Sequence, residues 1–287
     1  MAYDFASWFD RTRRVLVRSW KGILQLILLG YVVPVVLLAV LTTAIGFGSV
    51  VGYATIYNLR YDHHDPGAPS GGLPIVLALV ALVFVAVIGV LYLNAVTSLA
   101  IVKVATNDAA GTPLRPYDAF RSSLRLGWPT LGWMLVAGLI IGIGFVACIL
   151  PGIYLLAVTS LIVPIMAYER QGGFVGSFRL VHTNFWPAVG QLLLLYAAAL
   201  VVSWLANILL SVASLPVSTA RYGMNDLNGS VEVLSLLVSF GSAVVLQLIE
   251  AVSQLVLVTG FMVTYAQLRG RLQPDLSTAQ LAAEVNA

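Results

Sequence analysis

The chain has 287 residues, of which 60% are hydrophobic and 9% charged, with a net charge of +3. A soluble domain carries roughly a quarter charged residues, so this composition excludes a single water-soluble core. Apolar runs of about 18 residues or more recur along the chain, and each is long enough to cross a hydrocarbon layer of roughly 30 Å as a helix. Because the runs are continuously apolar, they favour helices over barrel strands. The composition predicts an all-α integral membrane protein.

The apolar runs predict six spans, at about 23–53, 73–102, 131–150, 153–168, 189–210 and 244–264. The first run is far longer than the apolar region of a signal peptide, so we expect it to remain in the mature protein. Polar stretches at 58–72 and 216–230 are expected to be solvent loops. Pro151 and Gly152 predict a tight turn between the third and fourth spans, and Cys148 is expected to be buried before it. Because the fourth run is short and contains Pro164, these two spans form either full crossings or a re-entrant hairpin.

Basic residues orient these spans. With the N-terminus inside, 13 of the 15 lysine and arginine residues lie on the cytoplasmic side, and Arg60 and Arg221 lie outside. Cytoplasmic loops carry the excess of basic residues in multi-pass proteins. We therefore expect both termini to be cytoplasmic.

A basic and aromatic motif occurs three times, with an arginine seven residues before a tryptophan. Two copies add a phenylalanine and a proline, and the third is looser: Phe120, Arg121, Trp128 and Pro129; Phe178, Arg179, Trp186 and Pro187; Arg13 and Trp20. The repeat predicts one membrane domain, 1–272, in three units of about 3–106, 115–170 and 173–270, followed by a short cytoplasmic tail, 273–287. Each unit is expected to contain a cytoplasmic amphipathic helix and two spans.

Each basic segment is amphipathic at helical spacing, and is predicted to lie in the interface with its apolar side toward the membrane. In the first segment, Trp8, Phe9 and Trp20 are expected on the apolar side. Tryptophan favours the headgroup level and proline suits the first turn of a helix, so Trp-Pro is expected where the chain enters the membrane. Such segments serve either as a general anchor or as a site for anionic lipids or a membrane partner.

The middle of the chain resembles a known family. The residues that carry the resemblance are Leu150 to Tyr154, Val163, Pro164, Glu169, Ser177 to Val181, Phe185 and Trp186. This pattern is similar to the glycerophosphoryl diester phosphodiesterase membrane-domain family and to related bacterial inner-membrane proteins of the YciC type. The resemblance implies a bacterial inner-membrane location. In the family the membrane part occurs alone or joined to a catalytic barrel of roughly 250 residues. Since 18 residues follow Arg269, we expect no hydrolase activity.

We find no catalytic constellation and no phosphate-binding glycine loop, and we expect no enzyme activity, no cofactor and no nucleic-acid partner. His63 and His64 are weak candidates for a metal site, because adjacent residues seldom point at one metal.

Glu250 is the most informative single residue, because a carboxyl group in an apolar span marks a candidate functional site. Gln247 and Gln254 share its helix face. Glu250 is either a ligand or proton site, or it bonds to another helix with Asn94 or Asn207 as partner, or it lies near the outer headgroups.

Two functions follow from these features. The first is a non-enzymatic inner-membrane protein that organises lipid or a membrane partner, such as a second copy, through its basic aromatic helices. The second is a secondary transporter or permeation pathway that uses Glu250.

Overall fold

The computed structural model describes residues 5–41, 72–170, 172–223 and 229–286. The helices in order are α1 (Phe5–Ile27), η1 (Leu28–Val32), α3 (Gly72–Ala110), α4 (Pro116–Ala147), α5 (Ile149–Thr159), α6 (Ile162–Tyr168), α7 (Gly173–Thr183), α8 (Phe185–Gly223), α9 (Gly229–Leu272) and α10 (Thr278–Asn286). Every element in these ranges is helical, which confirms the predicted all-α class. Six helical segments of the described chain are long and apolar enough to cross a membrane, judged by length and composition.

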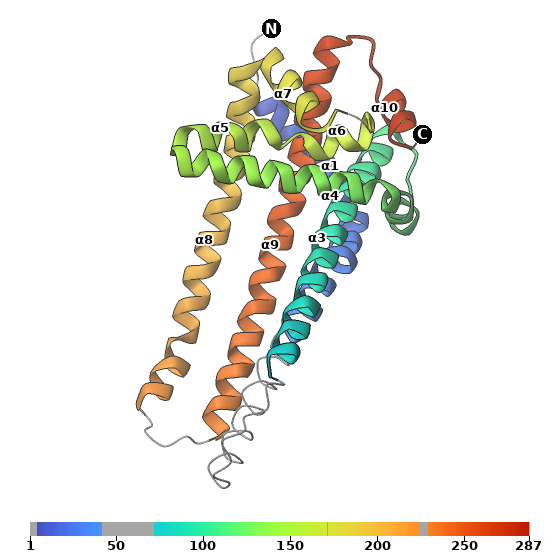
Figure 1. The fold of residues 1–287 in the computed structure, drawn as a ribbon. Coiled ribbons are helices and arrows are strands. Elements are labelled where there is room, and N and C mark those ends of the chain that lie inside the picture. The colour runs from blue at the N-terminus through green and yellow to red at the C-terminus, as the bar shows by residue number, and fades with distance from the viewer. Residues whose placement is uncertain (1–4, 42–71, 171, 224–228, 287) are drawn as a thin grey trace.

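The long helices and the short helices occupy different parts of the molecule (Figure 1). Helices α3, α8 and α9 run in one direction, together with α1 and its continuation. Helices α4 and α5 run across this direction near one end, where α6, α7, α10 and the C-terminus also lie (Figure 1). The end where the short helices gather is called the capped end below.

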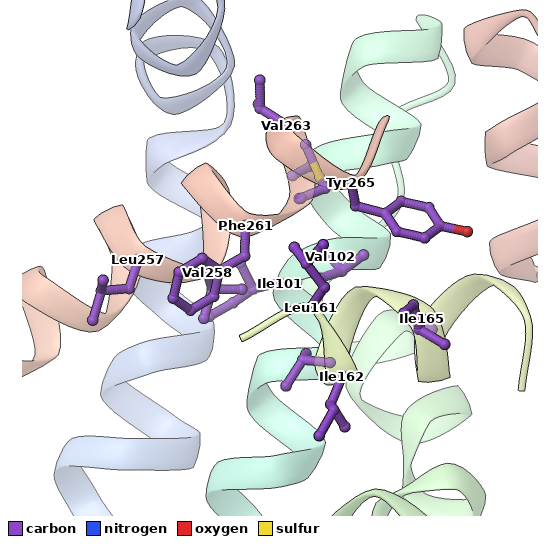
Figure 2. Packing of buried hydrophobic residues seen from close by; sticks show 14 of the residues in the cluster. Ile101, Val102, Leu161, Ile162, Ile165, Leu257, Val258, Phe261, Val263 and Tyr265 are labelled. Carbon is purple, nitrogen blue, oxygen red and sulfur yellow. The ribbon is translucent and has the colours of Figure 1, made fainter. Parts of the chain in front are cut away.

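The packed core lies at the capped end. On α3 every residue from Ala95 to Asn107 is buried, whereas large apolar side chains nearer its start are exposed, such as Phe84 and Val85. Figure 2 shows part of this core, where Ile101 and Val102 of α3 meet residues of α9 and of the α5–α6 region: Leu161, Ile162, Ile165, Leu257, Val258 and Phe261. Burying such side chains against one another fixes the short helices on the ends of the long ones.

The three copies of the motif adopt different local structures. The first lies within α1, which passes without a break through the π-helical turn η1 into a helix that continues to residue 41. The second lies within the continuous helix α4, with Pro129 in its interior. In the third copy α7 ends before Asn184, whose φ and ψ are −146° and 65°, and α8 begins at the next residue with Pro187 in its first turn.

The prediction of a separate amphipathic helix is therefore wrong for the first two copies. Aligning the motifs places Leu126 of the second copy at the position of Asn184 in the third. Leucine favours the helix interior, whereas asparagine bonds readily to nearby backbone and favours helix ends. The residue at this position therefore differs between the copy where the helix continues and the copy where it breaks.

The turn between the third and fourth predicted spans lies three residues earlier than expected. Helix α4 ends at Ala147, and Cys148 is extended, with φ and ψ of −172° and 153°. Pro151 belongs to the first turn of α5, where its missing N–H is not needed. The two arms touch through glycines, since a Cβ built on Gly144 would lie 3.1 Å from the Cα of Gly152. Cys148 is exposed at this corner, so its predicted burial is wrong.

Two other predicted boundaries change. The stretch 216–230 is mostly helical, because α8 continues to Gly223 and α9 begins at Gly229. The tail forms helix α10, which packs back onto the core through Leu281 and Val285. The predicted loop 58–72 lies outside the described residues except for its last position.

Candidate functional site

Glu250 lies midway along α9 and has a partner that the sequence did not indicate. The phenol of Tyr31, in η1, is hydrogen-bonded to the side chain of Gln247 and interacts electrostatically with Glu250. All three side chains are half-buried. Tyr31 is the only polar side chain between positions 26 and 41 of the first apolar run, and this was the available signal in the sequence.

The other predicted members of this polar site have local partners. Asn94 accepts a hydrogen bond of 3.5 Å from the hydroxyl of Ser98, one turn along α3. Asn207 is exposed and donates to the carbonyl of Ser203 at 2.8 Å. Gln254 is half-buried on α9, one turn beyond Glu250. Gln247 is therefore bonded to Tyr31 of η1 and Glu250 interacts with it electrostatically, while Asn207 is exposed.

The motif residues on α1, α4 and the α7–α8 region are mostly exposed basic and aromatic side chains. Their tryptophans have exposed fractions of 47% for Trp20, 61% for Trp128 and 81% for Trp186. The motif arginines are exposed as well: Arg13, Arg121 and Arg179. Phe120 is half-buried and Phe178 is 42% exposed. These exposed tryptophans and arginines, from three segments distant in sequence, are called the basic aromatic surface below.

The second copy of the motif is fixed against α3. The Tyr92 ring lies 4.8 Å from the ring of Trp128, and its hydroxyl donates to the carbonyl of Leu124 at 2.9 Å. Gly127 permits this approach, because a Cβ at that position would lie 2.5 Å from a methyl carbon of Val96. The position of α4 across α3 is thus set by Tyr92 and Gly127.

A cleft of about 640 Å³ opens between α1, α3, α9 and α10. One side is formed by three arginines of α1, Arg11, Arg14 and Arg18, which lie three and four residues apart and share one helix face. Apolar residues of α9 and of the C-terminal region form the opposite side, among them Met262 and Leu281. No carboxylate is among the described residues that line the cleft. It is positively charged on one side and apolar on the other.

The floor and one wall of this cleft are held by a polar network. Tyr168 is hydrogen-bonded to the buried hydroxyl of Thr106, and its ring stacks on that of Tyr265 with centroids 4.9 Å apart. The Tyr265 hydroxyl donates to Glu169 at 2.9 Å and accepts from Arg269 at 3.1 Å.

Two further contacts attach α10 beside the cleft. Arg269 forms a two-pronged ion pair with Glu284 of α10, at 2.5 and 3.0 Å. Asn286 of α10 donates to the side chain of Asn107 at 2.9 Å. The last helix therefore forms a fixed wall of the cleft.

The sequence did not predict the cleft, because its lining comes from five separate segments: α1, α3, α6, α9 and residues 276–281. The spacing of Arg11, Arg14 and Arg18 is visible in the sequence as one helix face, but it does not show what lies across from that face. In the structure these arginines are exposed and line one side of the cleft.

Within the described ranges, no three histidine, cysteine, aspartate or glutamate side chains gather as a metal site. His63 and His64 lie outside these ranges. Comparison with family models, curated proteins and solved structures finds no match. The resemblance to the phosphodiesterase membrane-domain family therefore stays a prediction.

Proposed function

We propose that this chain is a non-enzymatic, multi-pass protein of a bacterial inner membrane that binds anionic lipid headgroups through its basic aromatic surface. The observation that carries the proposal is the exposure of Trp20, Trp128 and Trp186 beside exposed arginines. A buried tryptophan contributes to packing, whereas an exposed one beside arginine suits the boundary between lipid and water.

The exposed part of α3 indicates where the hydrocarbon layer lies. Large apolar side chains are exposed at Leu77, Val80, Phe84 and Leu91, and burial becomes complete from Ala95. At 1.5 Å per residue, the stretch 77–94 measures about 27 Å along the axis. This length is close to the roughly 30 Å hydrocarbon thickness of a bilayer. In this interpretation the capped end lies on the cytoplasmic side of the membrane.

The hairpin of α4 and α5 then lies at the membrane boundary. Trp128 and Gly127 contact α3 at Tyr92 and Val96, the upper limit of the exposed stretch. The hairpin runs across the long helices (Figure 1). Its corner is apolar and exposed, with Val146 at 91% and Leu150 at 75%. We therefore propose four spanning segments and one hairpin embedded in the cytoplasmic leaflet, which is the re-entrant alternative.

The same register places Glu250 near this boundary. Helices α3 and α9 run in the same direction (Figure 1), and Thr106 contacts the sulfur of Met262 at 3.6 Å. Ten residues before Thr106 and Met262 in their helices stand Val96 of α3 and Val252 of α9. Because both helices rise equally per residue, Val96 and Val252 lie at one level along the helix axes. Glu250 is within one helical turn of that level. In this proposal Glu250 lies at the cytoplasmic end of the hydrocarbon layer rather than near the outer headgroups.

Lipid selectivity tests the function. Purified protein in mixed micelles would be titrated with phosphatidylglycerol or phosphatidylcholine, and the unfolding midpoint measured. We expect the anionic lipid to raise the midpoint more, and 0.5 M salt to reduce the difference. The double variant Arg121→Gln and Arg179→Gln should lose part of it, about 1 kcal/mol per residue at most.

The matched control is the double lysine variant at the same two positions, which keeps the charge and should retain the selectivity. Equal shifts with both lipids in the unmodified protein would contradict the proposal. So would a defined reaction catalysed by the protein in liposomes.

A second candidate function, transport, is favoured by the hydrogen bond of Tyr31 to Gln247 and by its electrostatic interaction with Glu250. A carboxyl group joined to polar side chains from another helix is the kind of site that proton-coupled transporters use.

A further inference from the structure

The cleft at the capped end has features that lipid anchoring does not explain. Arg11, Arg14 and Arg18 lie on one face of α1 and line one side of the cleft. Asp10 pairs with Arg14 at 3.0 Å. It is the only ion pair among described residues that involves these three arginines, so the cleft keeps a net positive charge.

A buried hydroxyl group also lines the cleft. Ser19 is 3% exposed, and its Oγ has no hydrogen-bond partner among the described residues. The hydroxyl lies on α1 next to Arg18. A buried polar atom without a partner costs about 1–3 kcal/mol, so such atoms commonly mark a position where a ligand or water binds.

Most of the remaining lining is apolar or aromatic, and Thr106, Gln267 and Thr278 are its other polar residues. Val15, Met262, Val263 and Leu276 contribute hydrocarbon surface, and Tyr168 lies at the floor. A volume of about 640 Å³ is within the usual range for small-molecule sites. Arginine binds phosphate oxygens with paired hydrogen bonds, which a compact ammonium group does not provide.

We propose that this cleft binds a phosphate ester that carries an apolar group, with its phosphate on Arg11, Arg14 and Arg18 and its apolar part against α9 and the α10 region. The serine hydroxyl at position 19 donates to a phosphate oxygen. Phosphate esters of this kind include short-chain or lysophospholipids and soluble organic phosphates.

The cleft lies apart from the second copy of the motif, on α4, whereas the first copy shares α1 with the arginines of the cleft. Thr106 and Met262 of its lining lie ten residues along α3 and α9 from the level where α4 crosses. This separation is about 15 Å toward the capped end. A ligand there is held away from the hydrocarbon layer, so binding at the cleft does not depend on how the hairpin meets the membrane.

Three probes distinguish the possible sources of the phosphate group. Glycerol 3-phosphate supplies the anion alone, dihexanoylphosphatidic acid supplies the anion with short apolar chains, and dihexanoylphosphatidylcholine supplies the chains with a neutral headgroup. Binding to full-length protein in a neutral detergent would be measured by calorimetry. We expect the phosphatidic acid to bind tightest. Comparable binding of glycerol 3-phosphate would assign the site to a soluble phosphate.

Variants on one helix separate the site from general charge attraction. Replacing Arg11, Arg14 and Arg18 with glutamine should weaken phosphatidic acid binding at least about tenfold, since each charged hydrogen bond contributes about 1.5–3 kcal/mol. Ser19→Ala should weaken it several-fold. Lys21→Gln removes one positive charge from α1 outside the lining of the cleft and should leave the affinity unchanged.

The unfolding midpoint of each variant without ligand shows whether the fold is kept. Single arginine variants are measured in the same way. Failure of all three probes to bind the unmodified protein would overturn the proposal, as would an equal loss in Lys21→Gln. In the Arg121→Gln and Arg179→Gln variant, the remaining phosphatidic acid binding should still weaken at least about tenfold when Arg11, Arg14 and Arg18 are replaced as well. Failure of the lipid-surface proposal is thereby distinguished from failure of this one.

Discussion

The indole nitrogen of Trp8 donates a hydrogen bond of 3.1 Å to the hydroxyl of Thr264, which joins the first long helix to the last. Trp8 is 1% exposed, and the Thr264 hydroxyl in turn donates to the carbonyl of Gly260 at 2.9 Å. The neighbouring Phe9 is 65% exposed. Trp8 is therefore a core residue that positions α1, and with it the arginines of the cleft.

Trp8→Ala is expected to lower the free energy of unfolding by about 3–5 kcal/mol, because it removes a large buried side chain and leaves a cavity. Trp8→Phe keeps most of the volume and loses one hydrogen bond, which should cost about 1 kcal/mol beyond its smaller size. The measurement is unfolding in detergent followed by fluorescence. Phe9→Ala is the matched control, and an equal loss in both alanine variants would show that Trp8 has no special role.

Gly30 of η1 packs directly against Thr97 of α3. A Cβ on this residue would clash with the Oγ1 of Thr97. Gly30→Ala should therefore destabilise the protein by about 1–3 kcal/mol through overpacking. Adding Thr97→Ala removes the clashing hydroxyl and should recover part of the loss.

Gly89 gives the opposite expectation on the partner helix. A Cβ there meets nothing within 4 Å among the described residues. Gly89→Ala should be neutral or stabilising by up to about 1 kcal/mol, since alanine favours a helix. Unfolding midpoints of the two alanine variants would be compared, and a loss at Gly89 equal to that at Gly30 would contradict the packing argument.

Much of the fold was predictable because apolar runs fix helix number and approximate position. The class followed from composition, and the long helices from their uninterrupted apolar stretches. The direction of α4 was not predictable from its composition. It depends on Tyr92 and Gly127, which form one contact between segments that are 35 residues apart.

The candidate sites also differ in how far the sequence could predict them. Glu250 and Gln247 were predictable because a polar residue in an apolar run is visible in one helix. Their partner Tyr31 and the cleft around Arg18 were not, since both depend on how distant helices pack. The difference between Leu126 and Asn184 was visible in the aligned repeats, but its effect on helix continuity became evident only in the structure.

Glu250→Gln distinguishes a transport role from a structural one. Glutamine keeps the shape of the side chain and can still form a hydrogen bond near Tyr31. The free energy of unfolding should therefore change by less than about 1 kcal/mol. If Glu250 carries protons, the variant should lose proton flux into protein-containing vesicles that carry a pH-sensitive dye. Tyr31→Phe is a companion variant that removes the hydroxyl in contact with the carboxyl region. Unchanged flux in Glu250→Gln would remove the transport hypothesis.

Cys148 allows a direct test of whether the hairpin crosses the membrane, because it is the only cysteine and is exposed at the corner. Close to this corner, the Tyr154 ring of α5 lies 6.0 Å from that of Phe185 at the start of α8. The corner should therefore be near the beginning of α8 and far from its end. Spin labels on Cys148 and on a second cysteine in α8 would report this distance in lipid vesicles.

Leu194 and Val212 are suitable second positions, since both are exposed, at 52% and 59%, and labels there leave the core intact. They lie about 27 Å apart along the helix, and a variant labelled at both, with Cys148→Ser, calibrates the measurement. We expect the distance from Cys148 to position 194 to be the shorter one. A hairpin that crosses the membrane would bring the corner toward the far end and reverse the order, which would restore six spans and remove the proposed leaflet-embedded hairpin.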